Sequence, residues 1–125
     1  MTKDCTPSRW DILQQKLRNL TTPEVPDFLR NHPQLVIIDC RRRAEFAAAH
    51  FPQARHIDYL APDFWPQITQ LPTDQVYLVY CNTGRRSART CTLMQNGGFQ
   101  NVYNLRGGLQ AWMDIYGKHS LITGQ

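Results

Sequence analysis

The sequence predicts an α/β domain in which a mostly parallel sheet is covered by helices on both faces. Two apolar runs, Leu35–Asp39 and Val76–Tyr80, have the length and the continuous hydrophobicity of strands that are buried on both faces. Segments with helical periodicity follow these runs. Such an alternation of strands and helices is typical of a parallel sheet between two layers of helices.

The composition is that of an ordinary globular domain. The 125 residues amount to one domain, which buries roughly two-thirds of its unfolded surface. No apolar run reaches the length of a membrane span, and the first ten residues lack the apolar core of a signal peptide. We therefore expect a cytoplasmic protein with no membrane partner.

The charges and the cysteines argue against two further classes of function. The net charge is +4, but the arginines lack the interleaved aromatic residues of a nucleic-acid-binding motif, so we expect no nucleic-acid partner. The four cysteines have no metal-ligand spacing and do not form a dense secreted framework, which indicates a reducing compartment and neither a metal nor another cofactor. Two arginine clusters favour a small anionic substrate: Arg41 to Arg43, and Arg85, Arg86 and Arg89.

Residues 1–20 are predicted to form a helical extension, separate from the domain of residues 21–125. Ser8 and Asp11 have capping-box spacing. Apolar residues recur every three or four positions and predict an amphipathic helix from about Arg9 to Leu20: Trp10, Leu13, Leu17 and Leu20. This apolar stripe either packs on its own domain, which is the simpler interpretation, or contacts a partner or a second copy.

Short elements are predicted in the next thirty residues. A break at residues 21–23 starts a second short helix that runs through Arg30. Pro26 fits only the first turn of that helix, because proline has no N–H to donate. The strand Leu35–Asp39 and a short helix, Arg42–Ala49, follow.

Residues 58–72 are predicted to be irregular or helical, and Pro66 favours two short pieces over one helix. The remaining pattern predicts three elements: a central strand, Val76–Tyr80, a last strand, Val102–Leu105, and a closing helix, Leu109–Tyr116.

Cys81 follows the central strand directly, at the start of a polar loop of residues 81–86 that leads into a helix from Ser87. The first turn of a helix presents unpaired N–H groups, so it stabilises a thiolate. Gly84 permits the positive φ that curves successive N–H groups round one point, and two arginines follow it. We therefore predict that Cys81 is a nucleophilic thiolate in an anion-binding loop. The alternative, a cysteine that merely ends a core strand, leaves the glycine and the arginines unexplained.

The loop CNTGRRS, at residues 81–87 between its strand and its helix, resembles the active-site loop of the rhodanese family. Residues 35–57 resemble the family's strand, Asp-x-Arg, Glu-Phe/Tyr and Gly-His-Ile-Pro-Gly-Ala pattern. Residues 98–112 resemble its Gly-Phe and Leu-x-Gly-Gly-x-x-Ala-Trp signatures. The chain departs from the pattern at three positions of the upstream block: Ala49, Phe51 and Gln53.

This resemblance implies a three-layer α/β/α fold with a central, mostly parallel sheet of about five strands. It implies that Cys81 is the catalytic residue. Asp39 and Arg41 would then brace the active-site loop, and Glu45 would fix local structure through hydrogen bonds, without acting on the substrate. The loop implied to bind the substrate and the persulfide consists of Asn82, Thr83, Gly84, Arg85, Arg86 and Ser87.

The implied reaction is sulfur transfer by double displacement. The Cys81 thiolate would attack the sulfane sulfur of thiosulfate or a similar small anionic donor, and sulfite would depart from a Cys81 persulfide. A thiol or cyanide would then accept the sulfur, and a protein acceptor is a further candidate. Arg86 would order the loop, whereas Arg85 would contact the donor's sulfonate.

Two other classes of function compete with this one. A cysteine phosphatase or an arsenate reductase on the same scaffold would resemble Cys-x5-Arg, but four residues separate Cys81 from Arg86 here. The second class is a protein-to-protein sulfur relay, or a partner-binding module, without small-molecule turnover. We interpret Cys40 and Cys91 as buried small residues, and leave open that one resolves the persulfide as a disulfide. His50 and His56 are interpreted as structural or rim residues and not as metal ligands.

Overall fold

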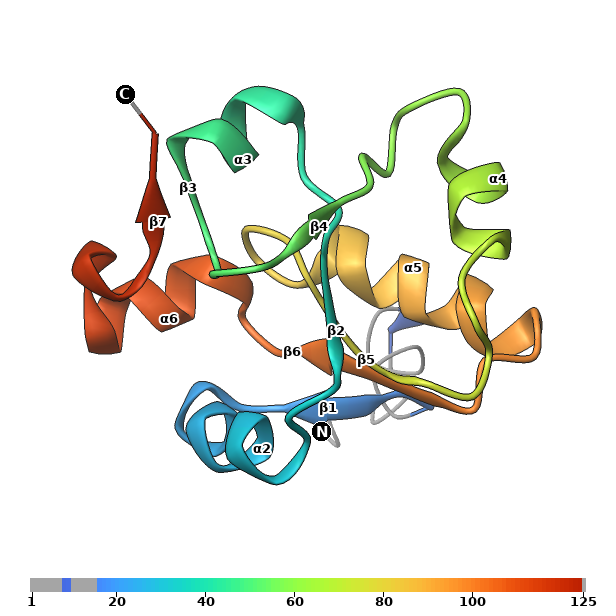
Figure 1. Ribbon diagram of the computed structural model, residues 1–125, viewed down its shortest axis with the longest axis horizontal. Helices are drawn as coiled ribbons and strands as arrows, with labels where there is room; N and C mark the ends of the chain where they lie inside the picture. Colours follow the sequence, from blue (N-terminus) through green and yellow to red (C-terminus); the bar gives the residue numbers. More distant parts are fainter. Residues whose placement is uncertain (1–7, 10–15, 125) are drawn as a thin grey trace, which may run out of the picture.

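The computed structural model describes residues 8–9 and 16–124. Within this part of the chain, five strands form one central sheet in the order β1-β6-β5-β2-β4 (Figure 1). Every neighbouring pair in it is parallel, so the prediction of a mostly parallel sheet of about five strands is confirmed. The strands are β1 (Arg18–Leu20), β2 (Val36–Asp39), β4 (Arg55–His56), β5 (Val76–Tyr80) and β6 (Asn101–Leu105).

Helices cover both faces of this sheet, which confirms the predicted three layers (Figure 1). Successive side chains of a strand point to opposite faces. Tyr77 and Val79 therefore pack under α4 (Phe64–Thr69) and α5 (Arg85–Asn96), whereas Leu78 and Tyr80 belong to the opposite core. That second core is built with α2 (Val25–Asn31) and α6 (Gly108–Tyr116). Among the described residues, no helix combines the length and the apolar character that a bilayer span requires.

The predicted helix Arg9–Leu20 is wrong at its C-terminal end. Arg18–Leu20 is strand β1, which pairs in parallel with Tyr103–Leu105 of β6. Leu17 and Leu20 lie in opposite cores, as expected for residues three positions apart in an extended chain. The same spacing of three is also found along one face of a helix, so the apolar pattern did not distinguish the two structures. Most of that helix, residues 10–15 with Trp10 and Leu13, lies outside the described residues. The division into an extension of residues 1–20 and a domain of residues 21–125 stays a prediction.

Two other boundaries differ from the prediction. Pro66 lies in the first turn of the single helix α4, where the N–H groups have no partner within the helix, so the predicted split into two pieces is wrong. Helix α5 begins at Arg85, two positions before Ser87, because Gly84 adopts φ 95° at its N-terminus. The first turn of α5 thus starts closer to Cys81 than the sequence indicated.

The remaining elements are short and lie around the sheet. The 3-10 turn η1 (Thr22–Glu24) precedes α2, and α3 (Arg43–Ala48) follows β2, as predicted within a residue or two. The chain end is tied to α3 by an antiparallel pair of β3 (Ala49–His50) and β7 (Ile122–Thr123). A second 3-10 turn, η2 (Lys118–Ser120), connects α6 to β7.

The first turn of α6 packs directly on the loop that follows β5. The N–H of Leu109 donates to the Cys81 carbonyl at 2.8 Å, and the N–H of Gln110 donates to the Asn82 carbonyl at 3.0 Å. Gly108 makes this approach possible, because a Cβ there would lie 2.4 Å from the Asn82 carbonyl oxygen. Its φ of +64° also favours glycine. The backbone of Cys81 and Asn82 is therefore fixed by a distant segment of the chain.

Replacing Gly108 tests this contact. In Gly108→Ala, the new methyl group must displace backbone atoms of Cys81 and Asn82, whereas Gly98→Ala adds a methyl group at a φ of +97° with nothing within 4 Å. We expect Gly98→Ala to lose about 1–2 kcal/mol of unfolding free energy from its backbone conformation alone. Gly108→Ala should lose a further ~1–3 kcal/mol from the steric overlap. Urea denaturation followed by circular dichroism measures both, and equal losses would contradict the proposed packing.

Candidate active site

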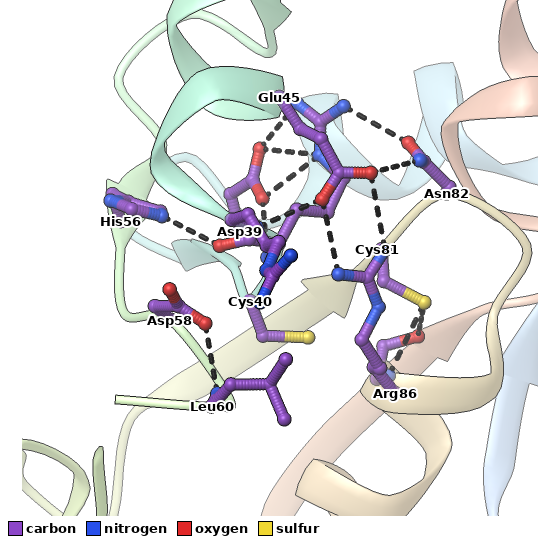
Figure 2. Close-up of polar contacts among 12 residues, drawn as sticks. Asp39, Cys40, Glu45, His56, Asp58, Leu60, Cys81, Asn82 and Arg86 are labelled. Atoms are coloured by element: carbon purple, nitrogen blue, oxygen red, sulfur yellow. Dashed lines mark hydrogen bonds and ion pairs between the residues drawn. The ribbon is translucent and has the colours of Figure 1, made fainter. Parts of the chain in front are cut away.

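Cys81 lies at the carboxyl end of the central strand β5, and its side chain faces the turn that starts α5 (Figure 2). Its Sγ accepts hydrogen bonds from the backbone N–H of Gly84 at 3.1 Å and of Ser87 at 3.4 Å. The Ser87 hydroxyl lies 3.4 Å from the same sulfur. Only 1% of Cys81 is exposed, so these polar groups replace water around the sulfur.

This environment lowers the pKa of Cys81 to about 5. The largest contribution is a hydrogen bond from the Cys40 thiol, and the Ser87 hydroxyl and the N–H groups of Ser87 and Gly84 add to it. Burial opposes ionisation but is outweighed. Because the pKa lies well below neutrality, Cys81 is a thiolate at physiological pH. Hydrogen-bond donors are the largest causes of this ionisation, and the charge of Arg86 also interacts with the Cys81 thiolate.

The two other buried cysteines have the opposite tendency. Burial raises the pKa of Cys40 well above its ordinary value, and the neighbouring Cys81 thiolate raises it further. Burial likewise raises the pKa of Cys91, again with a contribution from Cys81. Cys40 Sγ donates a hydrogen bond to the Tyr80 carbonyl at 3.4 Å. Both residues therefore stay protonated beside the Cys81 thiolate.

Glu45 joins three parts of the site. Its carboxylate accepts hydrogen bonds from Arg86 Nη1 at 3.1 Å, from the Arg42 N–H at 2.9 Å and from the Asn82 amide (Figure 2). Burial opposes the charge, but Arg86 and Arg42 hold the pKa of Glu45 below its ordinary value. Glu45, on α3, thus connects the first turn of α5 to the loop after β5.

Asp39 and Arg41 form a buried ion pair at the end of β2. The guanidinium donates to Asp39 Oδ2 from Nη2 at 2.8 Å, and Nη1 donates to the Asn82 side-chain oxygen at 3.0 Å. Arg41 also donates to the Ala49 carbonyl, so it links three segments. Asp39 and Arg41 are 0% and 4% exposed, and removing one partner of such a pair typically costs about 3–5 kcal/mol. The pair contacts the loop through Asn82, and its bracing role stays a prediction.

The predicted loop divides into an inner and an outer part. Gly84 and Ser87 are buried against the Cys81 sulfur, and Asn82 and Arg86 are partly buried in the Glu45 contacts. Thr83 and Arg85 are exposed. Arg85 is the first residue of α5. All six loop residues are therefore brought together around Cys81.

Two side chains contribute to the site that the sequence analysis missed. Asn104 is 1% exposed on β6, and its amide oxygen lies 2.6 Å from the Ser87 hydroxyl. Its amide nitrogen donates to Asn19 on β1 at 3.0 Å, so Ser87 is held from a neighbouring strand. The sequence signal for Asn104 was that it is a polar residue inside an otherwise apolar strand. The placement of Cys40 beside Cys81, which the sequence analysis left open, follows from the pairing of β2 with β5 and has no local sequence signal.

The histidines have structural contacts. His50 lies 2.8 Å from the Phe46 carbonyl and His56 lies 2.7 Å from the Arg41 carbonyl, and both rings stack on Phe46. Across residues 8–9 and 16–124, no three histidine, cysteine or acidic side chains gather as metal ligands would.

Comparisons with known proteins agree with this arrangement. The family model "Rhodanese-like domain" matches residues 21–115. The chain is 35% identical over 95 residues to the thiosulfate sulfurtransferase GlpE of Stutzerimonas stutzeri, which covers 75% of this chain and 84% of that protein. A crystal structure of a rhodanese-like domain protein from Staphylococcus aureus superimposes with a TM-score of 0.74 at 24% identity, over 87% of this chain and 100% of the other.

Other curated relatives are much longer than this chain. A protein of Mycobacterium tuberculosis named "Probable adenylyltransferase/sulfurtransferase MoeZ" is 31% identical over 93 residues, which cover 74% of this chain but only 24% of that protein. The chain spans about half, 52%, of the length of a second curated relative. The match of the family model to most of the chain, with a Cys81 loop of the kind described above, shows that this chain belongs to the rhodanese-like domain family and is related to sulfurtransferases.

Proposed function

We propose that the chain is a sulfurtransferase of the thiosulfate type, which moves a sulfane sulfur from thiosulfate or a similar anion to a thiol or cyanide. One observation carries this proposal. The Cys81 sulfur accepts hydrogen bonds from two backbone N–H groups, and its pKa is lowered to about 5, as a nucleophile that must form and hold an anionic persulfide requires. The names of the related sulfurtransferases support the same class of reaction.

The reaction proceeds in two displacements. The Cys81 thiolate attacks the outer sulfur of thiosulfate, the bond between the two donor sulfurs breaks, and sulfite leaves with the electron pair. The product is an anionic Cys81 persulfide, which the N–H groups of Gly84 and Ser87 are placed to stabilise. A thiolate or cyanide then attacks the outer sulfur and restores the Cys81 thiolate. Sulfite leaves in the first step and the low-pKa Cys81 thiolate leaves in the second, both as stable anions, so neither step needs a general acid.

The two adjacent arginines have different tasks in this proposal. Arg86 is paired with Glu45 and keeps the first turn of α5 in place. Arg85 is exposed on the same turn and is the side chain that we assign to the donor's sulfonate. The cytoplasm, where thiols stay reduced, suits an exchange with thiol acceptors, and we propose that location.

The competing phosphatase or arsenate-reductase function is less well supported. Its loop would need one more residue between the cysteine and the arginine to admit a tetrahedral oxyanion, whereas four residues separate Cys81 from Arg86. It would also need an acid for an alkoxide leaving group. Asp39, the nearest buried carboxylate on β2, is committed to Arg41.

A protein sulfur acceptor remains the second candidate. The similarity to the larger protein whose name includes both adenylyltransferase and sulfurtransferase favours it, because such a rhodanese-like segment is one part of a longer chain. In a relay, Cys81 would take up sulfur as proposed but would pass it poorly to cyanide.

Replacing Cys81 tests the proposed function. We expect purified, reduced protein to release thiocyanate from thiosulfate and cyanide, and Cys81→Ser to reduce the rate by more than about 1000-fold, because a serine hydroxyl is not ionised in this site. Cys91→Ser is the matched control, since it replaces the same atom away from the polar loop. No release by folded wild-type protein, or equal release by Cys81→Ser, would overturn the thiosulfate reaction. Hydrolysis of p-nitrophenyl phosphate that depends on Cys81 would favour the phosphatase.

The pH dependence of Cys81 reactivity tests the thiolate. Only the thiolate is alkylated, so the iodoacetamide rate should be constant from pH 8 down to the pKa of about 5 and fall tenfold per pH unit below it. Ser87→Ala replaces the polar hydroxyl 3.4 Å from the sulfur with a methyl group, which stabilises the thiolate less, so its midpoint should move to higher pH. Thr92→Ala, which removes a hydroxyl bonded to Ala88 on the same helix, should leave the midpoint unchanged. A wild-type rate that rises between pH 7 and 9 would contradict the account.

A further inference from the structure

Cys40 and Cys81 occupy matching positions on neighbouring strands. Strands β2 and β5 run in parallel, and their last paired residues are Asp39 and Tyr80. Cys40 and Cys81 are the next residue of each strand, and the Cys40 N–H continues the ladder by donating to the Tyr80 carbonyl at 3.1 Å. The two cysteines therefore end their strands side by side.

Their side chains lie on the same face of the sheet. Cys40 and Cys81 both belong to the core beneath α4 and α5, together with Tyr77 and Val79, whereas Leu78 and Tyr80 belong to the other core. Figure 2 shows the Cys40 side chain extending toward the side of the site that holds Cys81, and the Cys40 thiol contributes to the lowered pKa of Cys81. Strands β2 and β5 are direct neighbours in the sheet, so no other strand lies between the two cysteines.

The spacing of adjacent strands suits a disulfide. Neighbouring strands lie about 4.7–4.9 Å apart, and the Cα atoms of a disulfide lie about 4.4–6.8 Å apart. Cys91 is equally buried, but it lies on α5, outside the pairing of β2 with β5 that places Cys40 beside Cys81. Of the described cysteines, Cys40 is therefore the one placed to bond with Cys81.

We propose that Cys40 is the resolving cysteine of Cys81, and that a hydroperoxide converts the pair into a reversible disulfide. The Cys81 thiolate attacks the peroxide O–O bond, which breaks, and after protonation the products are Cys81 sulfenic acid and an alcohol or water. The Cys40 thiol then attacks the sulfenic sulfur. The S–S bond forms, the S–O bond breaks, and the Cys40 proton leaves with the hydroxyl as water.

The disulfide would interrupt over-oxidation of the site. Without a resolving thiol, sulfenic acid is oxidised further to sulfinic acid, which thiols do not reduce. A buried, protonated Cys40 does not compete with Cys81 for the first reaction, because the thiolate is the reactive form. External dithiols reduce the disulfide and restore both thiols. The inference depends on the Cys81 thiolate and goes beyond the proposed sulfur transfer.

Tryptic mapping of peroxide-treated protein tests the proposal directly. Trypsin places the four cysteines on four peptides, residues 4–9, 31–41, 56–85 and 90–106, so each pairing has its own mass. The full chain is reduced, freed of reductant, treated with hydrogen peroxide, alkylated and digested. We expect the peptide pair 31–41 with 56–85, joined by a disulfide that dithiothreitol removes, and recovery of Cys81 alkylation after reduction.

Two matched variants separate the resolving role from general oxidation. Cys40→Ala and Cys91→Ala each remove one buried sulfur from the same core. Cys91→Ala should form the 31–41 to 56–85 link as wild type does, whereas Cys40→Ala should accumulate Cys81 with two or three added oxygens that dithiothreitol does not remove. Cys40→Ser, which keeps a polar group near the Tyr80 carbonyl, serves if the alanine variant unfolds.

Two results would overturn the proposal. One is wild-type protein that accumulates over-oxidised Cys81 to the same extent as the Cys40 variants. The other is a disulfide that joins peptide 56–85 to residues 4–9 or 90–106 instead of 31–41. Because the readout is a mass and not turnover, these results are independent of whether thiosulfate is the sulfur donor.

Discussion

The contact between the first turn of α6 and the backbone after β5 is the constraint on which the site depends. The N–H groups of Leu109 and Gln110 hold the carbonyls of Cys81 and Asn82. With these carbonyls held away from the sulfur, the backbone can turn at Gly84 so that its own N–H and that of Ser87 reach Cys81 Sγ. The positive end of one helix thus shapes the loop, and the first turn of another, α5, stabilises the charge.

Charged side chains hold this loop from outside without neutralising the thiolate. Arg41 contacts the Asn82 side-chain oxygen and Glu45 contacts its nitrogen, so both ends of the amide are fixed. Arg41 is balanced by Asp39, and Arg86 is balanced by Glu45. The hydrogen bonds to the sulfur come from neutral groups, the N–H groups of Gly84 and Ser87, which stabilise an anion at the position of Cys81 Sγ. This is the electrostatic arrangement that a persulfide carrier needs.

The sequence was sufficient for the features that depend on local pattern. The apolar strand before Cys81, the polar loop with Gly84 and the helix after it were visible in consecutive residues, and the family resemblance extended them to the sheet. It was insufficient where distant segments decide. Strand β1 is three residues long and takes its conformation from pairing with β6, and the neighbours of Cys40 and Asn104 depend on strand order. The sequence also did not reveal the conformation of Gln53, which stands where the family pattern has glycine. Gln53 adopts a φ of 64°, so the turn keeps its left-handed backbone although the residue is not glycine.

The most direct test of the central claim is to locate the transferred sulfur. Reduced full-length protein is incubated with thiosulfate, the persulfide is alkylated, and the masses of the tryptic peptides are measured by mass spectrometry. The account predicts one added sulfur on peptide 56–85, which holds Cys81 and no other cysteine, and its loss on addition of cyanide. Sulfur on the peptides of Cys40 or Cys91, or no added sulfur on folded protein whose Cys81 still alkylates, would contradict the claim that Cys81 is the sulfur carrier.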